Sequence, residues 1–159
     1  SFPDEVKTAT SMIYDFWKEI GDEAAIEEFE MKPFDIRVQT LERTLIDKVF
    51  ALCDYAVSND TTGYSRHIYD LHRLLNVVSL DDKLKFLVKE VREDRKTHPR
   101  CYTAQDEYDI PEILEQIIDE KIYYKDYEDI TAKVLFDGTS YETSITAIQK
   151  IIDSKVFEK

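Results

Sequence analysis

The chain has 159 residues, of which 43% are hydrophobic, 12% aromatic and 35% charged. This length can bury one self-sufficient core, and the composition is that of a globular chain rather than a disordered one. The net charge of −13 argues against a general nucleic-acid binder, because phosphate binding needs a surplus of basic side chains.

Neither the cysteines nor the hydropathy indicates a special environment. Cys53 and Cys101 lie far apart in the sequence, so they suggest neither a disulfide framework nor a zinc site. The apolar runs are too short to span a membrane, and no signal leader opens the chain. We therefore expect a cytoplasmic protein that does not enter a membrane.

The N-terminal quarter is predicted to hold helices and a single strand. Apolar residues recur at three- and four-residue steps over residues 10–20, which predicts an amphipathic helix, and a shorter helix covers 25–29. Apolar and polar residues then alternate over Phe34–Val38, which predicts one strand. Because no other segment has a strand pattern, we expect this strand to pair in a dimer or with a sheet outside the chain.

The remainder is predicted to be helical, because only three glycines and four prolines interrupt the whole sequence. Two strong helices are expected over residues 41–57 and 64–75. Further helices are predicted from a capping box of Ser79 and Asp82 to Pro99, from Asp109 onward, over 126–136 and over 141–152. The fold class is therefore mainly α with one short N-terminal strand.

Lys48 is the first candidate site residue. On the helix over 41–57 it projects about 40° beyond the edge of the apolar arc, where neighbours can hold its stem while its ammonium reaches a cleft. Such a point charge suits a phosphate. An ordinary lysine with a solvated head explains the position equally.

Asp70 is the second candidate, and it follows Lys48 by 22 residues. On the helix over 64–75, Arg66, Asp70 and Arg73 fall within about 60° of one another. They predict either a surface ladder of ion pairs or an ionised aspartate that accepts a proton or orients a neighbour. His67 projects into the apolar arc, which is typical of a core histidine.

A local basic strip interrupts the acidic sequence. Residues 83–100 contain seven basic and three acidic side chains. Lys89, Arg92 and Lys96 are the candidates for nucleic-acid contact within the strip, although a solvated helix face explains the pattern as well. No glycine-rich phosphate loop, no paired metal-ligand histidines and no Asp-x-Asp occur, so no metal site is predicted.

The two motifs, Arg43-Thr44-Leu45-Ile46-Asp47-Lys48 and Tyr64-Ser65-Arg66-His67-Ile68-Tyr69-Asp70-Leu71, together resemble the AbiEii/AbiGii nucleotidyltransferase toxin family. In that family, an Arg-Thr-x-x-x-Lys helix precedes a helix with an Arg-(Asp or His)-x-x-Asp motif. The resemblance is close over residues 34–75. In the rest of the chain it extends only to a similar helical character.

The resemblance implies roles for four residues. Lys48 matches a phosphate-contacting lysine, Asp70 matches an aspartate required for nucleotide transfer, and Arg66 matches the arginine that opens the same motif. Arg43, which opens the first motif, is a further candidate for nucleotide binding. His67 stands where many members have aspartate.

The family's Gly-Ser turn and its Asp-x-Asp metal site are absent from this sequence. The resemblance therefore implies the carboxyl-terminal part of a nucleotidyltransferase-like α+β fold, with residues 1–40 as the trailing portion of the core and 41–159 as a helical region. The parent protein would transfer a nucleotide from a triphosphate, with Mg²⁺, to an acceptor such as tRNA.

The same resemblance implies a bacterial toxin–antitoxin or abortive-infection system for phage defence, with a possible antitoxin partner. We expect this chain alone to be inactive and to bind no Mg²⁺ by itself. The alternative is a non-catalytic, acidic, helical protein-interaction module, whose surface would suit a basic partner.

Overall fold

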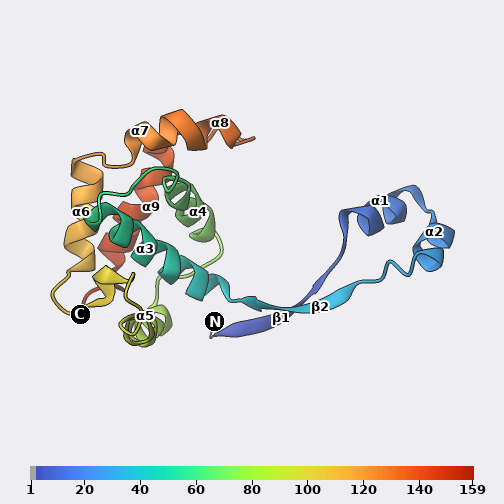
Figure 1. Ribbon diagram of the computed structural model, residues 1–159, viewed down its shortest axis with the longest axis horizontal. Helices are drawn as coiled ribbons and strands as arrows, with labels where there is room; N and C mark the ends of the chain where they lie inside the picture. Colours follow the sequence, from blue (N-terminus) through green and yellow to red (C-terminus); the bar gives the residue numbers. More distant parts are fainter. Residues whose placement is uncertain (1–2) are drawn as a thin grey trace. The chain divides into compact units, whose positions relative to one another are not determined.

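The computed structural model describes residues 3–159 and is mainly α-helical, with a two-stranded sheet near the N-terminus (Figure 1). This arrangement confirms the predicted fold class. The chain divides into two compact units, of which the first ends at Thr40 and the second runs from Leu41 to Lys159. None of the described helices has the length and apolar character needed to cross a membrane.

The first unit is a β-hairpin whose strands are connected by two helices. Strand β1 (Asp4–Ala9) and strand β2 (Phe34–Gln39) are antiparallel, with Asp4 opposite Gln39 and Ala9 opposite Phe34. Helices α1 (Met12–Ile20) and α2 (Glu23–Glu28) connect the strands. The predicted strand and both predicted helices in this part of the chain are therefore confirmed within one or two residues at most ends.

The expectation that the strand at 34–38 finds no partner in this chain is wrong, because β1 pairs with it. Val6 is the one large apolar side chain in β1, so its sequence lacks the alternation that marks a strand. Contacts with the partner strand, rather than an alternating apolar pattern, stabilise β1. Arg37 donates to Asp4 at 2.8 Å, and Thr8 donates to Asp35 at 2.8 Å.

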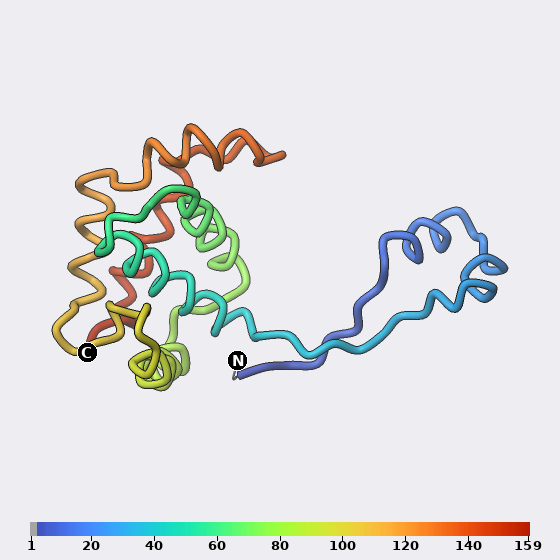
Figure 2. Tube along the Cα trace, in the orientation of Figure 1, coloured from blue at the N-terminus to red at the C-terminus, as the bar shows by residue number. Residues whose placement is uncertain are grey.

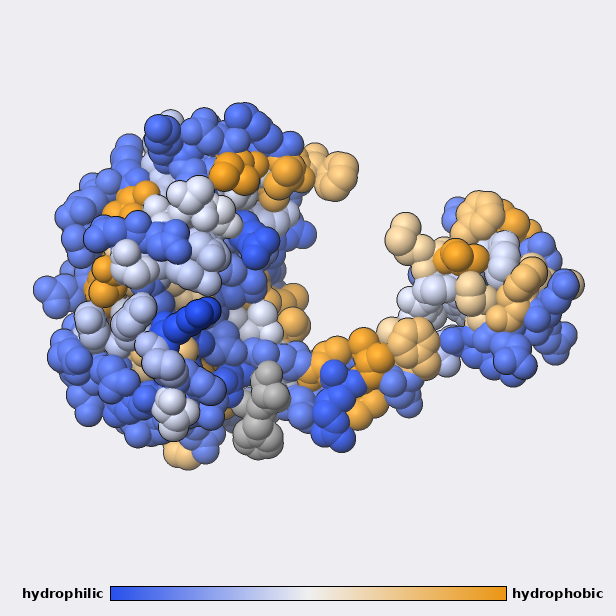
Figure 3. All heavy atoms as spheres, in the orientation of Figure 1, coloured by the Kyte–Doolittle hydropathy of each residue, from blue (hydrophilic) through white to orange (hydrophobic). Residues whose placement is uncertain are grey.

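The first unit leaves much of its apolar surface exposed (Figure 3). No residue of α1 is buried, and Phe16 is 56% exposed on that helix. On the hairpin, Val6 is 59% and Phe34 is 53% exposed. Ile26 is the buried hydrophobic residue of this unit in the described part of the chain. The hairpin and α1 thus present apolar faces that this unit does not cover.

The second unit is a helical bundle arranged around α3. Its elements are α3 (Leu41–Val57), α4 (Arg66–Leu74), α5 (Asp82–Arg95), the 3-10 turn η1 (Tyr102–Ala104), α6 (Ile110–Asp119), α7 (Tyr124–Asp126), the π-helical turn η2 (Tyr127–Thr131), α8 (Ala132–Val134) and α9 (Tyr141–Ser154). Helix α3 contacts α4, α5 and α6, while α9 packs on α4 and α6. The predicted helix over 41–57 has the bounds of α3.

The core forms because α3 buries an apolar arc nearly along its whole length. Leu45, Val49, Phe50 and Leu52 on this helix are fully buried. The Tyr123 hydroxyl, also buried, donates to the Leu52 carbonyl at 2.7 Å, so its polar atom is satisfied inside the core. Helix α3 is therefore a fixed platform for the side chains on its more exposed sides.

The start of α4 is held by a distant carboxylate. Ser65 precedes the helix but makes no capping bond with its side chain, which instead pairs with Thr131 at 2.7 Å. Asp126 accepts from the backbone N–H of Gly63 at 2.7 Å and of Ser65 at 3.1 Å. These bonds replace a local helix cap and fix where α4 begins.

The segment that supplies Asp126 departs from its prediction. A single helix was expected over 126–136, but helical structure begins at Tyr124, passes through the π-helical turn and ends at Val134. Within the π-helical turn, the Tyr127 ring is fully buried and its hydroxyl lies 2.8 Å from Ser144 Oγ. This turn brings Tyr127 and Thr131 to the core together, an arrangement that local periodicity does not encode.

Candidate functional site

Helices α3 and α4 lie side by side (Figure 2). Their packing brings Lys48 and Asp70 together. The Lys48 Nζ atom donates to Asp70 Oδ2 at 2.6 Å. The two side chains are 24% and 35% exposed, so the pair lies at the border of the core and remains accessible to solvent. Two residues 22 positions apart in the sequence thus form one half-buried ion pair.

His67 completes the cluster around this pair. Its Nδ1 atom lies 3.5 Å from Lys48 Nζ and 3.8 Å from Asp70 Oδ2. The imidazole is mostly buried but faces the ion pair as well as aromatic neighbours, so the expected role as a simple core histidine is incomplete. A ring at these distances lines one side of the site.

Asp70 is kept ionised by its neighbours. Partial burial acts to raise the pKa of Asp70, but the nearby His67 imidazole and Lys48 ammonium lower it by more, and the net pKa lies below the ordinary value. At 2.6 Å against 3.8 Å, the lysine is the closer partner. Asp70 is therefore a carboxylate at neutral pH.

The predicted ladder of Arg66, Asp70 and Arg73 does not form. Asp70 turns to Lys48 on α3, while Arg73 pairs with Asp137 at 3.4 Å. Arg66 is exposed at the first position of α4, and in the described part of the chain no hydrogen bond or ion pair holds its side chain. The neighbouring helix offers Asp70 a closer cation than its own helix does.

Arg43 belongs to a different group of charges. It is 7% exposed and donates to Asp47 at 3.0 Å and to Asp94 at 3.1 Å. Arg95 from α5 donates to the other oxygen of Asp47 at 2.9 Å and to buried Asp54 at 2.9 Å. These contacts join α3 to α5, and they already compensate the charge of Arg43.

The basic strip is largely used inside the fold. Arg92 donates to the backbone carbonyls of Ala104 at 3.1 Å and Tyr108 at 2.9 Å. Lys96 pairs with Glu93 and Asp106, each at 2.7 Å, while Lys89 is exposed. The structure therefore does not gather these three residues into one free basic surface.

Carboxylates are not clustered as a metal site would require. Within residues 3–159, no group of three histidine, cysteine, aspartate or glutamate side chains is placed to hold a metal ion. Asp70 is close to a lysine rather than to a second carboxylate. Among the described residues there is thus no ready cluster of three protein ligands for a cation.

Sequence reasoning missed the aromatic wall beside His67. The Tyr55 and Tyr64 rings are stacked with centroids 3.5 Å apart, and their centroids lie 6.4 Å and 6.2 Å from that of His67. Tyr55 follows Lys48 by seven residues, which is two helical turns on the same side of α3. That spacing is the signal that could have revealed it.

The fold and the site together define the class of protein. It is a helical domain with a half-exposed lysine–aspartate pair between two adjacent helices. The chain matches the sequence profile of the family described as nucleotidyl transferase AbiEii toxin, type IV toxin–antitoxin system, over residues 5–153. It therefore belongs to this nucleotidyltransferase toxin family, whose toxin–antitoxin systems imply an antitoxin partner. No curated protein and no solved structure gives a significant match.

Proposed function

We propose that Lys48, oriented by Asp70, contacts the phosphates of a nucleoside triphosphate during nucleotide transfer to an acceptor such as tRNA. The observation that supports this role most directly is the half-exposed pair itself, held at 2.6 Å between α3 and α4 in a member of a nucleotidyltransferase toxin family. An accessible ammonium held by a carboxylate is oriented before a ligand arrives. Arg66, exposed at the start of α4, is the nearest further cation in the motif.

The two members of the pair have different roles in this proposal. Lys48 supplies the point charge that neutralises a phosphate oxygen. Asp70 has a lowered pKa and is therefore a weak base, which favours orientation of Lys48 over removal of a proton from the acceptor. When Lys48 turns toward a phosphate, it gives up part of its contact with Asp70, so ligand binding competes with the ion pair.

The proposed reaction uses Mg²⁺ in the parent protein, and residues 3–159 do not form a fitting site for it. We propose that a nucleotidyltransferase core supplies those ligands and that it packs against the first unit. The exposed apolar faces of the hairpin and α1 support this arrangement, because such faces mark interaction surfaces. On this proposal the isolated chain does not catalyse transfer.

The test is nucleotide transfer by the intact protein as encoded. Asp70→Asn keeps the size of the side chain but removes the charge that holds Lys48, and it should abolish transfer of label from a nucleoside triphosphate. Asp137→Asn is the matched control, since Asp137 pairs with Arg73 at the end of the same helix and should leave transfer unchanged.

Full transfer by the Asp70→Asn protein would refute the assigned role. Absence of transfer by the wild-type protein would instead favour the alternative of a non-catalytic, acidic, helical interaction module. The apolar faces of the first unit would then be the interaction surface, and their acidic surroundings would suit a basic protein partner.

A further inference from the structure

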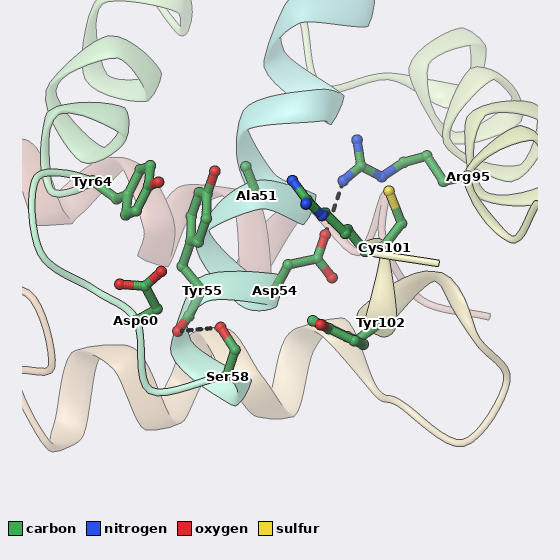
Figure 4. Close-up of a pocket in the computed structure, with 10 residues that line it drawn as sticks. Ala51, Asp54, Tyr55, Ser58, Asp60, Tyr64, Arg95, Cys101 and Tyr102 are labelled. Atoms are coloured by element: carbon green, nitrogen blue, oxygen red, sulfur yellow. Dashed lines mark hydrogen bonds and ion pairs between the residues drawn. The ribbon is translucent and has the colours of Figure 1, made fainter. Parts of the chain in front are cut away.

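A cleft of about 450 Å³ lies in the second unit between the C-terminal half of α3, the end of α5 and η1. Tyr55 and Tyr64 lie on one side of it with nearly parallel rings, and Tyr102 lies on another side beyond Asp54 (Figure 4). Its volume falls in the range of small-molecule sites. This is a preformed opening with three aromatic side chains on its walls.

Two arginines add positive charge to this aromatic cleft. Arg100 is exposed. Arg95 also lines the cleft, and its Nε–H is a buried donor without an acceptor in the described part of the chain. A buried donor of this kind is rare in native proteins.

The acidic residues of the cleft offset part of this charge, because Asp54 pairs with Arg95 at 2.9 Å. Asp54 is fully engaged, since Oδ2 accepts from Arg95 and Oδ1 accepts from the backbone N–H and hydroxyl of Thr103, both at 2.7 Å. Asp60 is exposed, so its carboxylate is solvated and can accept from an amino group. An incoming anion therefore meets the exposed Arg100 rather than a free buried carboxylate.

We infer that this cleft binds one unpaired nucleotide, with its base against the tyrosine rings and its phosphate at Arg100. Aromatic side chains bind bases through their faces, and arginine binds phosphate through paired N–H groups. The Asp60 carboxylate is suited to an exocyclic amino group on the base edge. A free nucleotide and a nucleotide within a single strand share this chemistry.

The aromatic wall of the cleft contacts His67 of the candidate site. Tyr64 stacks beside His67, which lies 3.5 Å from the Lys48 ammonium. If the proposed transfer function holds, on which this part of the inference rests, the cleft holds an unpaired nucleotide of the acceptor strand beside the reacting phosphates. Binding in the cleft itself requires no transfer.

The inference is tested by titrating this chain, labelled in its tyrosine rings, with adenosine monophosphate and separately with a four-residue oligoadenylate RNA, followed by NMR at low salt. Adenine combines a large stacking surface with an exocyclic amino group. Resonances of Tyr55, Tyr64 and Tyr102 should shift saturably, whereas those of Tyr124 and Tyr141 should not. Tighter binding of the RNA would identify a strand as the source, and equal binding would identify a free nucleotide.

Tyr102→Ala should weaken binding by about 5- to 100-fold, as expected for loss of one base–aromatic stack. Tyr102 is 44% exposed, so its truncation should leave the fold intact; Tyr124→Ala, at 39% exposure outside the cleft, is the matched control. Absence of saturable shifts with both probes, or unchanged affinity of the Tyr102→Ala chain, would overturn the inference. Neither result depends on Asp70. The proposed transfer function is therefore tested separately, by the Asp70→Asn experiment.

Discussion

Two groups of ion pairs lie on α3, and they differ in how far water reaches them. Arg43, Asp47 and Asp54 lie on one side of the helix, where Arg95 from α5 joins them. Lys48 points about 100° away from Asp47, toward Asp70 on α4. The side chains of Asp54 and Arg95 are 8% and 14% exposed, whereas those of Lys48 and Asp70 are 24% and 35% exposed.

This difference in exposure assigns a structural role to the Asp54–Arg95 pair and a functional role to the Lys48–Asp70 pair, although both pairs join a basic residue to an aspartate. The carboxylate of Asp54 has partners on both oxygens, and those partners come from α5 and η1. Exchanging any of them for a ligand would leave a buried charge unpaired, at a cost of several kcal/mol. Lys48 can exchange Asp70 for another anion because water can solvate both groups during the exchange.

The largest expected effect is a loss of stability when the buried ion pairs of Asp54 are removed. Asp54→Ala removes the acceptor of Arg95 and of the Thr103 N–H, and it should lower the free energy of unfolding by about 3–5 kcal/mol in urea titrations. Asp94→Ala is the control, since Asp94 is 60% exposed and also pairs with an arginine of this group; its cost should be about 0–1 kcal/mol. Equal costs for the two variants would contradict the distinction by burial.

A smaller effect is expected where Asp126 holds the start of α4. Asp126→Ala leaves the Gly63 and Ser65 N–H groups without their acceptor and should cost about 1.5–3 kcal/mol, as for hydrogen bonds to charged groups. Hydrogen exchange of these two amides should accelerate. Asp129→Ala, an exposed position in the same segment, should change neither quantity. Unaltered exchange at Gly63 in the Asp126→Ala chain would show that the helix start is fixed by other contacts.

The smallest expected effect on stability is the pH dependence due to the Lys48–Asp70 pair. The pKa of Asp70 is lower in the folded chain than its usual value of about 3.9, so its stabilising contribution is present above that pH and is lost as pH falls through the folded pKa. The stability difference between the wild-type and Asp70→Asn chains should therefore shrink from pH 6 to pH 3. A difference that grows on acidification would contradict the assigned sign, and in a Lys48→Met background the pH dependence should be reduced, with the contribution of His67 remaining.

The local patterns of the sequence predicted much of the helical region and part of the site. The bounds of α3 and the helix start at Asp109 follow from periodicity and capping, and the two motifs singled out Lys48 and Asp70 as candidate site residues. Strand β1 was missed because Val6 is its one large apolar side chain, so that its conformation depends on pairing with β2.

The ion-pair partners were less predictable because they join distant parts of the chain. Arg95 bonds to Asp54 across 41 positions, and Asp126 bonds to Gly63 across 63. Periodicity places Asp70 on the same face as Arg66, but it cannot show that α4 packs with Asp70 against Lys48. The walls of the tyrosine-lined cleft likewise come from α3, α5 and η1, so no single one of these segments predicts the cleft.

The most direct test of the account is nucleotide transfer by the intact protein carrying Lys48→Met, measured together with its urea unfolding. Methionine keeps an apolar stem at the edge of the core but removes the ammonium. The account predicts a fall in transfer on the order of 100-fold, typical of losing one electrostatic contact to a reacting group, with almost unchanged stability. Lys133→Met, at an exposed lysine on α8, should behave like the wild type. Wild-type transfer by the Lys48→Met protein would contradict the central claim.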